Sequence, residues 1–424
     1  MTIFLSTGRA PDGAQPAGGQ IPAGRPVLFL IADTGGGHRA AAEAVAQRLA
    51  SLPGNFIPVL LDPLAGPAAP WLLRQVIRLY GPAIRHLPRA WAAAYRLTDT
   101  RAGMVLLRAA LLRAADRPVR AAFADLAPVA VVSCHPLLTA TAAGAARRAP
   151  GHVPAVTVIT DLVTAHRSWR HPGADRIVAP SAAVRDRCRR AGLPPASCAE
   201  LGLPVRAAFA GGPPSAAARR ALRRRLGVPA GRFLVVVTGG GEGAGGLAWV
   251  VRALLRGAPD AGVVAICGRN DRLRRRLARL AGGSGGRLAV TGFVGDMASW
   301  LCCADLVVSK PGPGTIAEAA CCGVPMLLTA PAGGQEAGNA EWVIGAGAGR
   351  HARRPAELLR EVARLRGDPA ALARMRAAAT RLAQPEAASS TARLIAGLAA
   401  GQAWQPAAGT AAAASRAGGL HVRG

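Results

Sequence analysis

The single lysine of this chain, Lys310, is followed by a Gly/Pro-rich turn and then by an alanine-rich helical pattern. The apolar run 305–308 before it predicts a buried parallel strand, and Thr315 after it is a good N-cap for the helix. A strand, a glycine turn and a helix N-terminus form an anion cradle, because unpaired backbone N–H groups converge there. Pro311 excludes a P-loop, in which serine or threonine follows the lysine. The residues of this segment assigned to a nucleotide-sugar site are Lys310, Gly312, Pro313, Gly314 and Thr315.

Polar side chains near this turn could bind the hydroxyls of a nucleotide sugar. Glu318 lies about one helical turn further on, where its carboxylate can accept two hydrogen bonds from vicinal ribose hydroxyls. Gln335, Glu336 and Asn339 follow the next apolar run and could bind the hydroxyls of a hexose. The alternatives are an ordinary first-turn carboxylate for Glu318 and a solvated helix start for 335–339.

In the first half of the chain, three glycines after an apolar run precede His38. A histidine at a helix N-terminus lies at the positive end of the helix dipole, which disfavours the imidazolium. Neutral imidazole near pH 7 is what a general base needs, so His38 is the predicted base. Asp161, at another strand end, could orient or charge-stabilise His38, or cap the turn that follows. Gly36 and Gly37 are assigned to the site of the acceptor, the substrate whose proton such a base would take. His135 is expected to be structural.

Short apolar runs alternate with helical patterns through most of the chain, which predicts an α/β fold of parallel sheets with helices on both faces. Ligands bind beyond the carboxyl ends of such strands, so five Gly-containing loops at one edge predict a nucleotide pocket. The predicted strands are 27–31, 56–61, 129–133, 155–159 and 176–179 in the first half, and 233–237, 263–267, 288–291, 305–308 and 325–328 in the second. The further loop residues assigned to binding the nucleotide sugar are Gly239, Gly240, Gly241, Glu242 and Arg269.

The length of 424 residues favours two domains or a single large one. The segment 206–230, rich in Gly, Pro, Ala and Arg, is the expected linker between a Rossmann-like domain at 26–205 and another at 231–400. The ends, 1–25 and 401–424, are expected to be disordered. The predicted architecture is two Rossmann-like domains that face a central cleft.

The net charge of +29 could indicate a nucleic-acid-binding protein. However, the arginines are dispersed, and no basic run alternates with stacking aromatic residues. An anionic membrane surface is the better electrostatic partner, because dispersed positive charge can bind it without any contact to nucleic-acid bases. The eight cysteines lack CxxC metal spacing, so free buried thiols and no metal or other cofactor are expected.

The segment 71–112 differs from the rest, because four of the nine Trp and Tyr residues lie between positions 71 and 95, among arginines. Aromatic residues and arginine on amphipathic helices favour a membrane interface, and the alternative is a helical insertion that packs on the core. The residues concerned are Trp71, Tyr80, Trp91 and Tyr95. No apolar stretch approaches the roughly 18 residues that span a bilayer, and the N-terminus is too short for a secretory signal. A peripheral protein at the cytoplasmic face is therefore expected.

Together these segments resemble the monogalactosyldiacylglycerol synthases and related diacylglycerol glycosyltransferases, in the same family as the bacterial GlcNAc transferase of peptidoglycan synthesis. The resemblance covers about residues 26–350. The segments that carry it are 33–39, 160–166, 202–206, 239–243, 267–270, 292–294, 310–319 and 334–339. Pro311 departs from the family pattern, in which a small residue is expected.

The resemblance implies a GT-B fold, a UDP-hexose donor in the C-terminal domain, and diacylglycerol held by the N-terminal domain. It also implies inversion at the anomeric carbon without a metal. By this likeness Glu318 would hold the ribose, Gln335 and Glu336 the sugar, and His38 would be the base. The expected product is a membrane glycolipid, with galactose favoured. The alternatives are a glucosyl- or GlcNAc-transferase for another lipid, a soluble nucleotide-sugar epimerase, and a nucleic-acid-binding protein.

Overall fold

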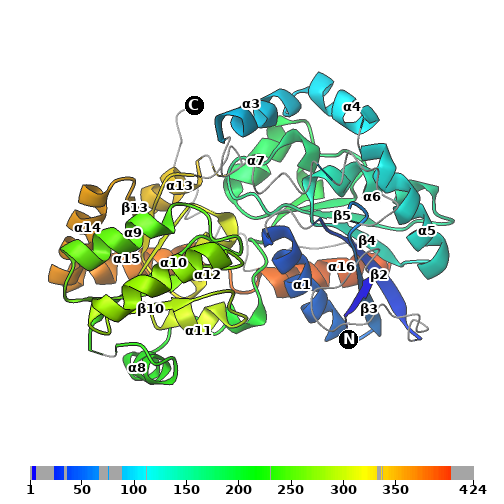
Figure 1. Cartoon of the computed structure of the whole chain (residues 1–424). Coiled ribbons are helices and arrows are strands. Elements are labelled where there is room, and N and C mark those ends of the chain that lie inside the picture. The colour runs from blue at the N-terminus through cyan, green and yellow to red at the C-terminus, as the bar shows by residue number, and fades with distance from the viewer. Residues whose placement is uncertain are drawn as a thin grey trace. The chain divides into compact units, whose positions relative to one another are not determined.

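The computed structural model describes residues 2–5, 23–32, 36–65, 75, 88–110, 112–229, 231–331, 336 and 338–402. The chain forms two compact units (Figure 1). The first unit consists of residues 1–206 and 386–424, and the second of residues 207–385.

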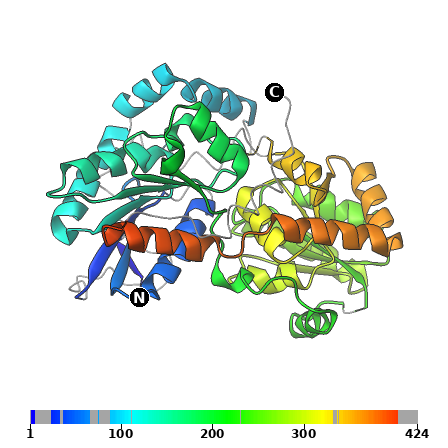
Figure 2. The same ribbon diagram turned by 180° about the vertical axis from the view of Figure 1, so that it is seen from behind.

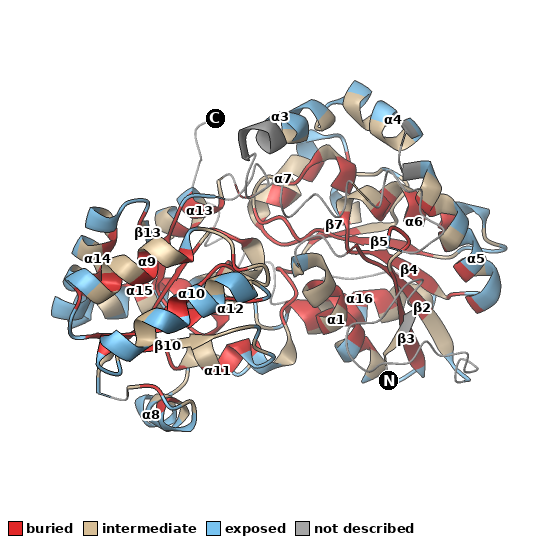
Figure 3. Cartoon of the chain, viewed as in Figure 1, coloured by how far each residue is buried: buried red, intermediate tan, exposed pale blue. Residues whose placement is uncertain are grey.

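The first unit is built on a parallel sheet of seven strands, counted over the described residues, in the order β1-β3-β2-β4-β5-β6-β7. Its inner strands are mostly apolar because helices cover both faces, and Figure 3 shows them as buried. The strands are β1 (Ile3–Leu5), β2 (Arg25–Leu30), β3 (Phe56–Leu61), β4 (Ala130–Ser133), β5 (Ala155–Val158), β6 (Arg176–Ala179) and β7 (Cys198–Glu200).

Successive side chains of β2 point to opposite faces of this sheet and enter two separate cores. Phe29 packs in the core that α1 and α16 cover, whereas Leu28 and Leu30 pack in the core that α5 and α6 cover. The helices of this unit are α1 (Gly37–Ala50), α3 (Pro88–Thr98), α4 (Arg101–Ala110), α5 (Asp116–Leu126), α6 (Thr139–Arg148), α7 (Ala182–Arg190) and α16 (Ala387–Ala399), with the 3₁₀ helices η1 (Leu112–Ala115), η2 (Pro136–Leu138), η3 (Arg167–Trp169) and η4 (Pro195–Ser197).

The second unit has a six-stranded parallel sheet in the order β10-β9-β8-β11-β12-β13, again counted over the described positions. Its strands are β8 (Phe233–Thr238), β9 (Ala261–Ile266), β10 (Leu288–Thr291), β11 (Leu306–Ser309), β12 (Met326–Leu328) and β13 (Gly349–His351). Its helices are α8 (Ala216–Arg225), α9 (Leu247–Gly257), α10 (Asp271–Ala281), α11 (Met297–Cys302), α12 (Pro313–Cys321), α13 (Asn339–Gly345), α14 (Pro355–Gly367) and α15 (Pro369–Leu382), with η5 (Ala207–Phe209) and η6 (Gly282–Ser284).

Each sheet has one point where the strand order reverses direction. It lies between β2 and β4 in the first unit and between β8 and β11 in the second. The connections on either side of such a point leave toward opposite faces, so a crevice opens beyond the carboxyl ends of the two strands. The second unit has the strand order 3-2-1-4-5-6 of dinucleotide-binding folds, when its strands are counted from β8.

All ten predicted strands are present, and the structure adds the short strands β1, β7 and β13. Strand β1 pairs with β3, so residues 3–5 are ordered, contrary to the prediction of a disordered N-terminus. The predicted linker 206–230 was wrong, because it contains α8, whose Arg223 donates to the Cys303 carbonyl oxygen at 2.9 Å within the second unit. The remainder of the predicted C-terminal tail, residues 403–424, lies outside the described residues.

The predicted C-terminal domain 231–400 was wrong at its end, because α16 belongs to the first unit. Figure 2 shows α16, in orange-red, across the first unit's sheet. Leu394 and Ile395 are fully buried in the core that contains Phe29, and Arg25 donates to the Ala399 carbonyl oxygen at 2.6 Å. Sequence order alone assigns α16 to the second unit, which it directly follows in the chain. Its apolar face instead completes the core of the first unit.

Asp305, just before β11, is the centre of a charge cluster in the second unit. Its Oδ2 lies 2.6 Å from Arg223 Nη2 and accepts a hydrogen bond from the Leu234 backbone at 2.8 Å. Its Oδ1 lies 3.1 Å from Arg376 Nη2 and 3.4 Å from Arg219 Nη1. The Arg223 side chain is only 7% exposed, so Asp305 neutralises a guanidinium that water barely reaches.

We predict that Asp305→Asn strongly destabilises the second unit, since it leaves buried guanidinium groups without a counter-charge. The expected loss is about 3 kcal/mol in the free energy of unfolding, measured by urea denaturation. The matched control is Asp260→Asn, which breaks the 2.6 Å pair with Arg366 at an aspartate that is 72% exposed. This control should lose about 1 kcal/mol or less. Equal losses in the two variants would contradict the structural role of the cluster.

Candidate functional site

At the switch point of the second sheet, the loops after β8 and β11 approach each other closely. A Cβ atom on Gly245, where φ is +86°, would lie 3.0 Å from Lys310 Cβ. Lys310 Nζ forms an ion pair with the carboxylate of Glu336, whose side chain is 4% exposed. The lone lysine therefore does two things here, since it fills the space beside a glycine loop and neutralises a buried carboxylate.

Helix α12 begins one loop beyond Lys310, and its N-cap is Gly312 rather than the predicted Thr315. Pro313 takes the first helical position, where its fixed φ suits the helix and its missing N–H costs nothing. Gly312 has no side chain to cap the first turn, and the backbone N–H groups of Gly314 and Thr315 lie in that turn, where a helix supplies no carbonyl acceptor for them. Together with the helix dipole, they make this turn suitable for an anion.

The polar residues around α12 occupy different depths. Glu318 is half-buried on α12. Asn339 is fully buried, and its Nδ2 donates to the Pro311 carbonyl oxygen at 3.0 Å. Asn339 thus supports the turn from beneath. Gln335 lies outside the described residues.

The loops after β8 and β9 pack against each other through glycine. A Cβ atom on Gly268 would lie 2.3 Å from the Gly241 carbonyl oxygen, and one on Gly243 would lie 2.1 Å from the Cys267 carbonyl oxygen. The Arg269 backbone donates to that Gly241 oxygen at 2.7 Å. A larger residue at Gly243 or Gly268 would push the two loops apart, so these glycines set the shape of the rim.

The predicted donor residues of these loops lie on the same edge of the sheet. The Arg269 guanidinium lies 3.4 Å from Glu242 and 4.9 Å from the ring centre of Phe293, which is 60% exposed. Gly240 has φ +70°, and a Cβ atom there would meet nothing within 4 Å, whereas one on Gly239 would clash with the Ala244 backbone.

The first unit places His38 at its own switch point, in the first turn of α1. Gly36 is the N-cap of this helix in the left-handed conformation, with φ 81°, which explains a glycine there. His38 Nδ1 lies 2.7 Å from Thr160 Oγ1, at the end of β5. The ring of His38 meets that of His135, which follows β4, edge-on at 4.6 Å between centroids.

The surroundings of His38 keep its imidazole neutral. Burial lowers its pKa to about 4, and a hydrogen bond with the Cys134 backbone acts in the opposite direction. Burial and the neighbouring His38 likewise hold the pKa of His135 well below its usual value. His135 also accepts a hydrogen bond from the Leu137 backbone at 3.3 Å, which fits the structural role predicted for it.

Asp161 is buried, and its Oδ2 accepts a hydrogen bond from the indole Nε1 of Trp169 at 2.7 Å. The Trp169 ring lies 5.9 Å from that of His38. Thr160 therefore contacts His38 Nδ1 directly, while Asp161 holds the fully buried tryptophan beside it. The sequence pointed to the loop 160–166 but not to Trp169, because no pattern in the chain links an indole to a carboxylate eight positions earlier.

The segment predicted to be interfacial is described only from Pro88 onward, apart from residue 75, so Trp71 and Tyr80 lie outside the described residues. Trp91 lies in α3, and the structure does not describe its side chain. Tyr95 donates to the Thr164 carbonyl oxygen at 2.8 Å, and its ring packs against His166 at 4.9 Å. Tyr95 thus fastens α3 to the loop that carries Asp161.

The described residues contain neither a membrane-spanning helix nor a cluster of metal-binding side chains. None of the helices there has the length and apolar character needed to cross a membrane. No three His, Cys, Asp or Glu side chains in the described parts of the chain gather as a metal site would require.

Comparison with known proteins gives the family. A family model described as monogalactosyldiacylglycerol (MGDG) synthase matches residues 38–205, and one described as the glycosyltransferase family 28 C-terminal domain matches residues 234–391. The probable chloroplastic monogalactosyldiacylglycerol synthase 2 of Oryza sativa subsp. japonica is 35% identical over 398 residues, which cover 91% of this chain and 84% of that protein. This chain belongs to the monogalactosyldiacylglycerol synthase family.

Other relatives and solved structures agree with this result. Monogalactosyldiacylglycerol synthase 1 of Arabidopsis thaliana is 34% identical over 381 residues, covering 87% of this chain and 70% of the relative. MurG of Acinetobacter baumannii has a TM-score of 0.55 at 18% identity and covers 88% of this chain and 99% of its own. Anabaena HepE, solved in complex with UDP-glucose, has a TM-score of 0.53 at 16% identity, covering 89% and 99% of the two chains. The fold of this family member is GT-B, as predicted.

We predict that His38 contributes to the loss of stability in acid. Its folded-state pKa is lowered from 6.5 to about 4, so between these values the unfolded chain binds a proton that the folded chain does not. This contribution is present above pH 6.5 and is lost as the pH falls toward 4. Relative to the wild type, His38→Asn should save about 2 kcal/mol between pH 7 and pH 5, measured by chemical denaturation at each pH. His152→Asn, at a 76% exposed histidine, should give no such saving, and an equal saving would refute the assignment.

Proposed function

We propose that this chain is a hexosyltransferase that moves galactose from UDP-galactose to the hydroxyl of diacylglycerol and so makes a membrane glycolipid. The observation that carries the proposal is the 35% identity over 398 residues with a protein named monogalactosyldiacylglycerol synthase. The same fold also serves nucleotide-sugar epimerases, since a putative UDP-N-acetylglucosamine 2-epimerase from Listeria monocytogenes has a TM-score of 0.57 at 17% identity. That likeness extends to the fold alone, whereas the synthase likeness covers the sequence.

The second unit would bind the donor at the β8–β11 switch point. Backbone N–H groups of Gly314 and Thr315 would hold the diphosphate, and Glu318 would accept hydrogen bonds from the ribose hydroxyls. Glu336, already neutralised by Lys310, would accept hydrogen bonds from the hexose. Because that carboxylate is buried, its lysine partner fixes its position before the donor arrives, and less ordering is left for binding.

The proposed reaction is a single displacement at the anomeric carbon. The acceptor oxygen forms a bond to C1, the bond from C1 to the diphosphate oxygen breaks, and UDP leaves with the electron pair. His38 would take the proton of the acceptor hydroxyl, for which its imidazole must be neutral. Amide dipoles at α12 would stabilise the leaving UDP, so we propose that no metal is needed.

We also propose that the protein works as a peripheral protein at the cytoplasmic face of a membrane. Helices α3 and α4 support this, because Leu97, Val105 and Leu106 are about two-thirds exposed there, at 70%, 68% and 69%. Large apolar side chains that gather on a helical surface favour a lipid partner. The net charge of +29 favours an anionic surface.

The test of the function is the product. Purified protein is incubated with diacylglycerol in non-ionic micelles and either UDP-galactose or UDP-glucose, with EDTA present. We expect a galactosyl lipid with β-anomeric configuration and no loss of rate with the chelator. Glucosyl lipid as the main product would overturn the donor assignment. An epimerised nucleotide sugar without lipid product would overturn the function itself.

Two substitutions should separate the roles of the two units. His38→Ala should lower kcat by about a hundredfold or more with little change in the donor KM, since a general base acts in the transition state. Glu318→Ala should raise the donor KM by about tenfold, because it removes hydrogen bonds to the ribose. Steady-state kinetics at saturating acceptor measures both. The assignments fail if His38→Ala keeps the wild-type kcat or if Glu318→Ala binds UDP as tightly as the wild type in calorimetry.

A further inference from the structure

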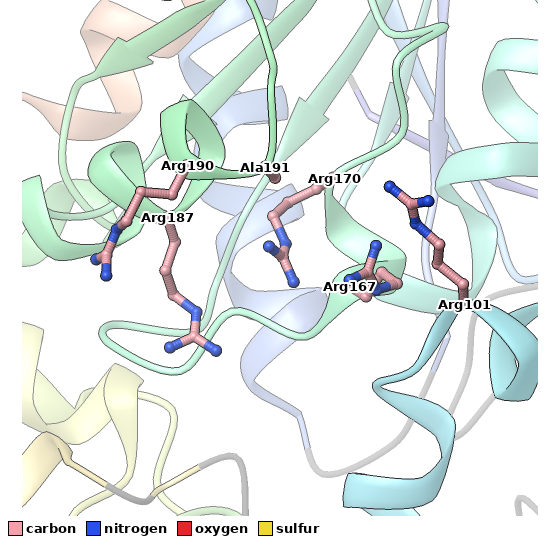
Figure 4. A pocket seen from close by; sticks show the side chains of 6 residues that line it. All are labelled: Arg101, Arg167, Arg170, Arg187, Arg190 and Ala191. Atoms are coloured by element: carbon pink, nitrogen blue, oxygen red, sulfur yellow. The ribbon is translucent and has the colours of Figure 1, made fainter. Parts of the chain in front are cut away.

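The first unit contains a cavity of about 350 Å³ whose walls are almost entirely arginine. Figure 4 shows the side chains entering it from three separate segments. Arg101 begins α4, Arg167 and Arg170 lie in and after η3, and Arg187 and Arg190 lie in the last turn of α7. Residues up to 89 positions apart thus bring five guanidinium groups to one site, which is more positive charge than the local packing requires.

The charge in this cavity is poorly compensated. The Nε atoms of Arg167, Arg170 and Arg187 are buried and have no hydrogen-bond partner among the described residues. Asp99 lies 3.8 Å from Arg170 Nη2, and its Oδ1 already accepts a hydrogen bond from the Arg167 backbone at 2.5 Å. Burial lowers the pKa of Arg170, Asp99 raises it, and the charges of Arg187 and Arg167 lower it further.

The contrast with the second unit shows that this arrangement is not a structural ion cluster. There, Asp305 accepts from both the Arg223 and Arg376 side chains at 3.1 Å or less, and the charges satisfy each other inside the fold. In the arginine cavity, five cations surround an open volume. Guanidinium groups in such an arrangement match the oxygens of phosphate, which they can bind in bidentate geometry.

The arginine cavity adjoins the exposed apolar surface of this unit. Helix α4 provides Arg101 to the cavity, packs against η3, and also carries the exposed Val105 and Leu106. Leu97, on the preceding helix α3, adds to the same apolar surface. Figure 3 shows α3 and α4 at the outer edge of the unit, with exposed residues along both. A phosphate on one side of α4 and hydrocarbon on the other describe the two parts of a phospholipid.

We propose that this cavity binds the phosphate of an anionic lipid headgroup while the apolar side chains of α3 and α4 enter the adjacent hydrocarbon. The proposal rests on the proposed function, in which the first unit takes its acceptor from a membrane. It adds a lipid site that is separate from the acceptor, because diacylglycerol has no phosphate for five arginines to bind. The site would fix the unit on the membrane at one place instead of through diffuse charge.

Partition of the full-length protein onto sedimented vesicles tests this site. The vesicles contain phosphatidylcholine alone or phosphatidylcholine mixed with phosphatidylglycerol. The test variant is Arg101→Gln/Arg187→Gln/Arg190→Gln, at the rim of the cavity. The matched control, Arg272→Gln/Arg276→Gln/Arg279→Gln, removes the same charge from exposed positions on α10. We expect the test variant to bind the anionic vesicles about thirtyfold more weakly than the wild type, and the control about threefold or less.

Each other outcome overturns the proposal. Equal weakening in both variants would show that only total charge matters. Inorganic phosphate that binds the wild type but not the variant in calorimetry, with vesicle partition unchanged, would assign the cavity to a soluble phosphate. Thermal unfolding of each variant checks the fold, and Arg170→Gln, deeper in the cavity, must repeat the loss. The partition assay uses no donor, so a failure of galactosyl transfer and a failure of this site give separate results.

Discussion

Parallel strands that helices cover on both faces can present polar chemistry only beyond their ends. In each unit the inner strands are buried and mostly apolar, and the candidate groups follow their carboxyl ends: His38 at the start of α1 after β2, Thr160 and Asp161 after β5, and Lys310 and Gly312 after β11. The reversal of strand order then selects which of these ends are open. Every proposed role in donor binding and proton transfer depends on this constraint.

The same constraint explains why so much of the fold could be predicted from the sequence. Strands buried on both faces must be unbroken apolar runs, and all ten runs chosen on that basis are strands. The short edge strand β13 lacks that signal, because it contains Arg350 and His351. Strand β1 is apolar but only three residues long. The helix start at Gly312 was misplaced by three residues, since Thr315 is the better N-cap by type, but Pro313 fixes an earlier start.

The candidate site could be predicted less completely, for a different reason. The loop glycines and Lys310 are conspicuous in the amino-acid sequence, whereas the residues that they contact in the fold are not. Nothing in the sequence indicates that Lys310 would neutralise Glu336, or that Asp161 would hold Trp169. These pairings depend on how loops from different strands meet, which periodicity does not encode. Five arginines line a cavity in the first unit (Figure 4): Arg101, Arg167, Arg170, Arg187 and Arg190. The sequence did not reveal this cavity, because the chain is so rich in arginine that the five that converge do not stand out.

Helix α16 has a consequence for how the protein is made. Its buried Leu394 and Ile395 complete the core around Phe29, which leaves the ribosome some 360 residues earlier. The second unit, residues 207–385, emerges whole before that helix does. The first unit must therefore wait, with part of its sheet uncovered, until translation is nearly over, although it is the first to be synthesised. A chain that ends before α16 has a complete second unit, but the first unit exposes the apolar surface that α16 would cover. This exposed surface makes the truncated chain a target for chaperones and proteases.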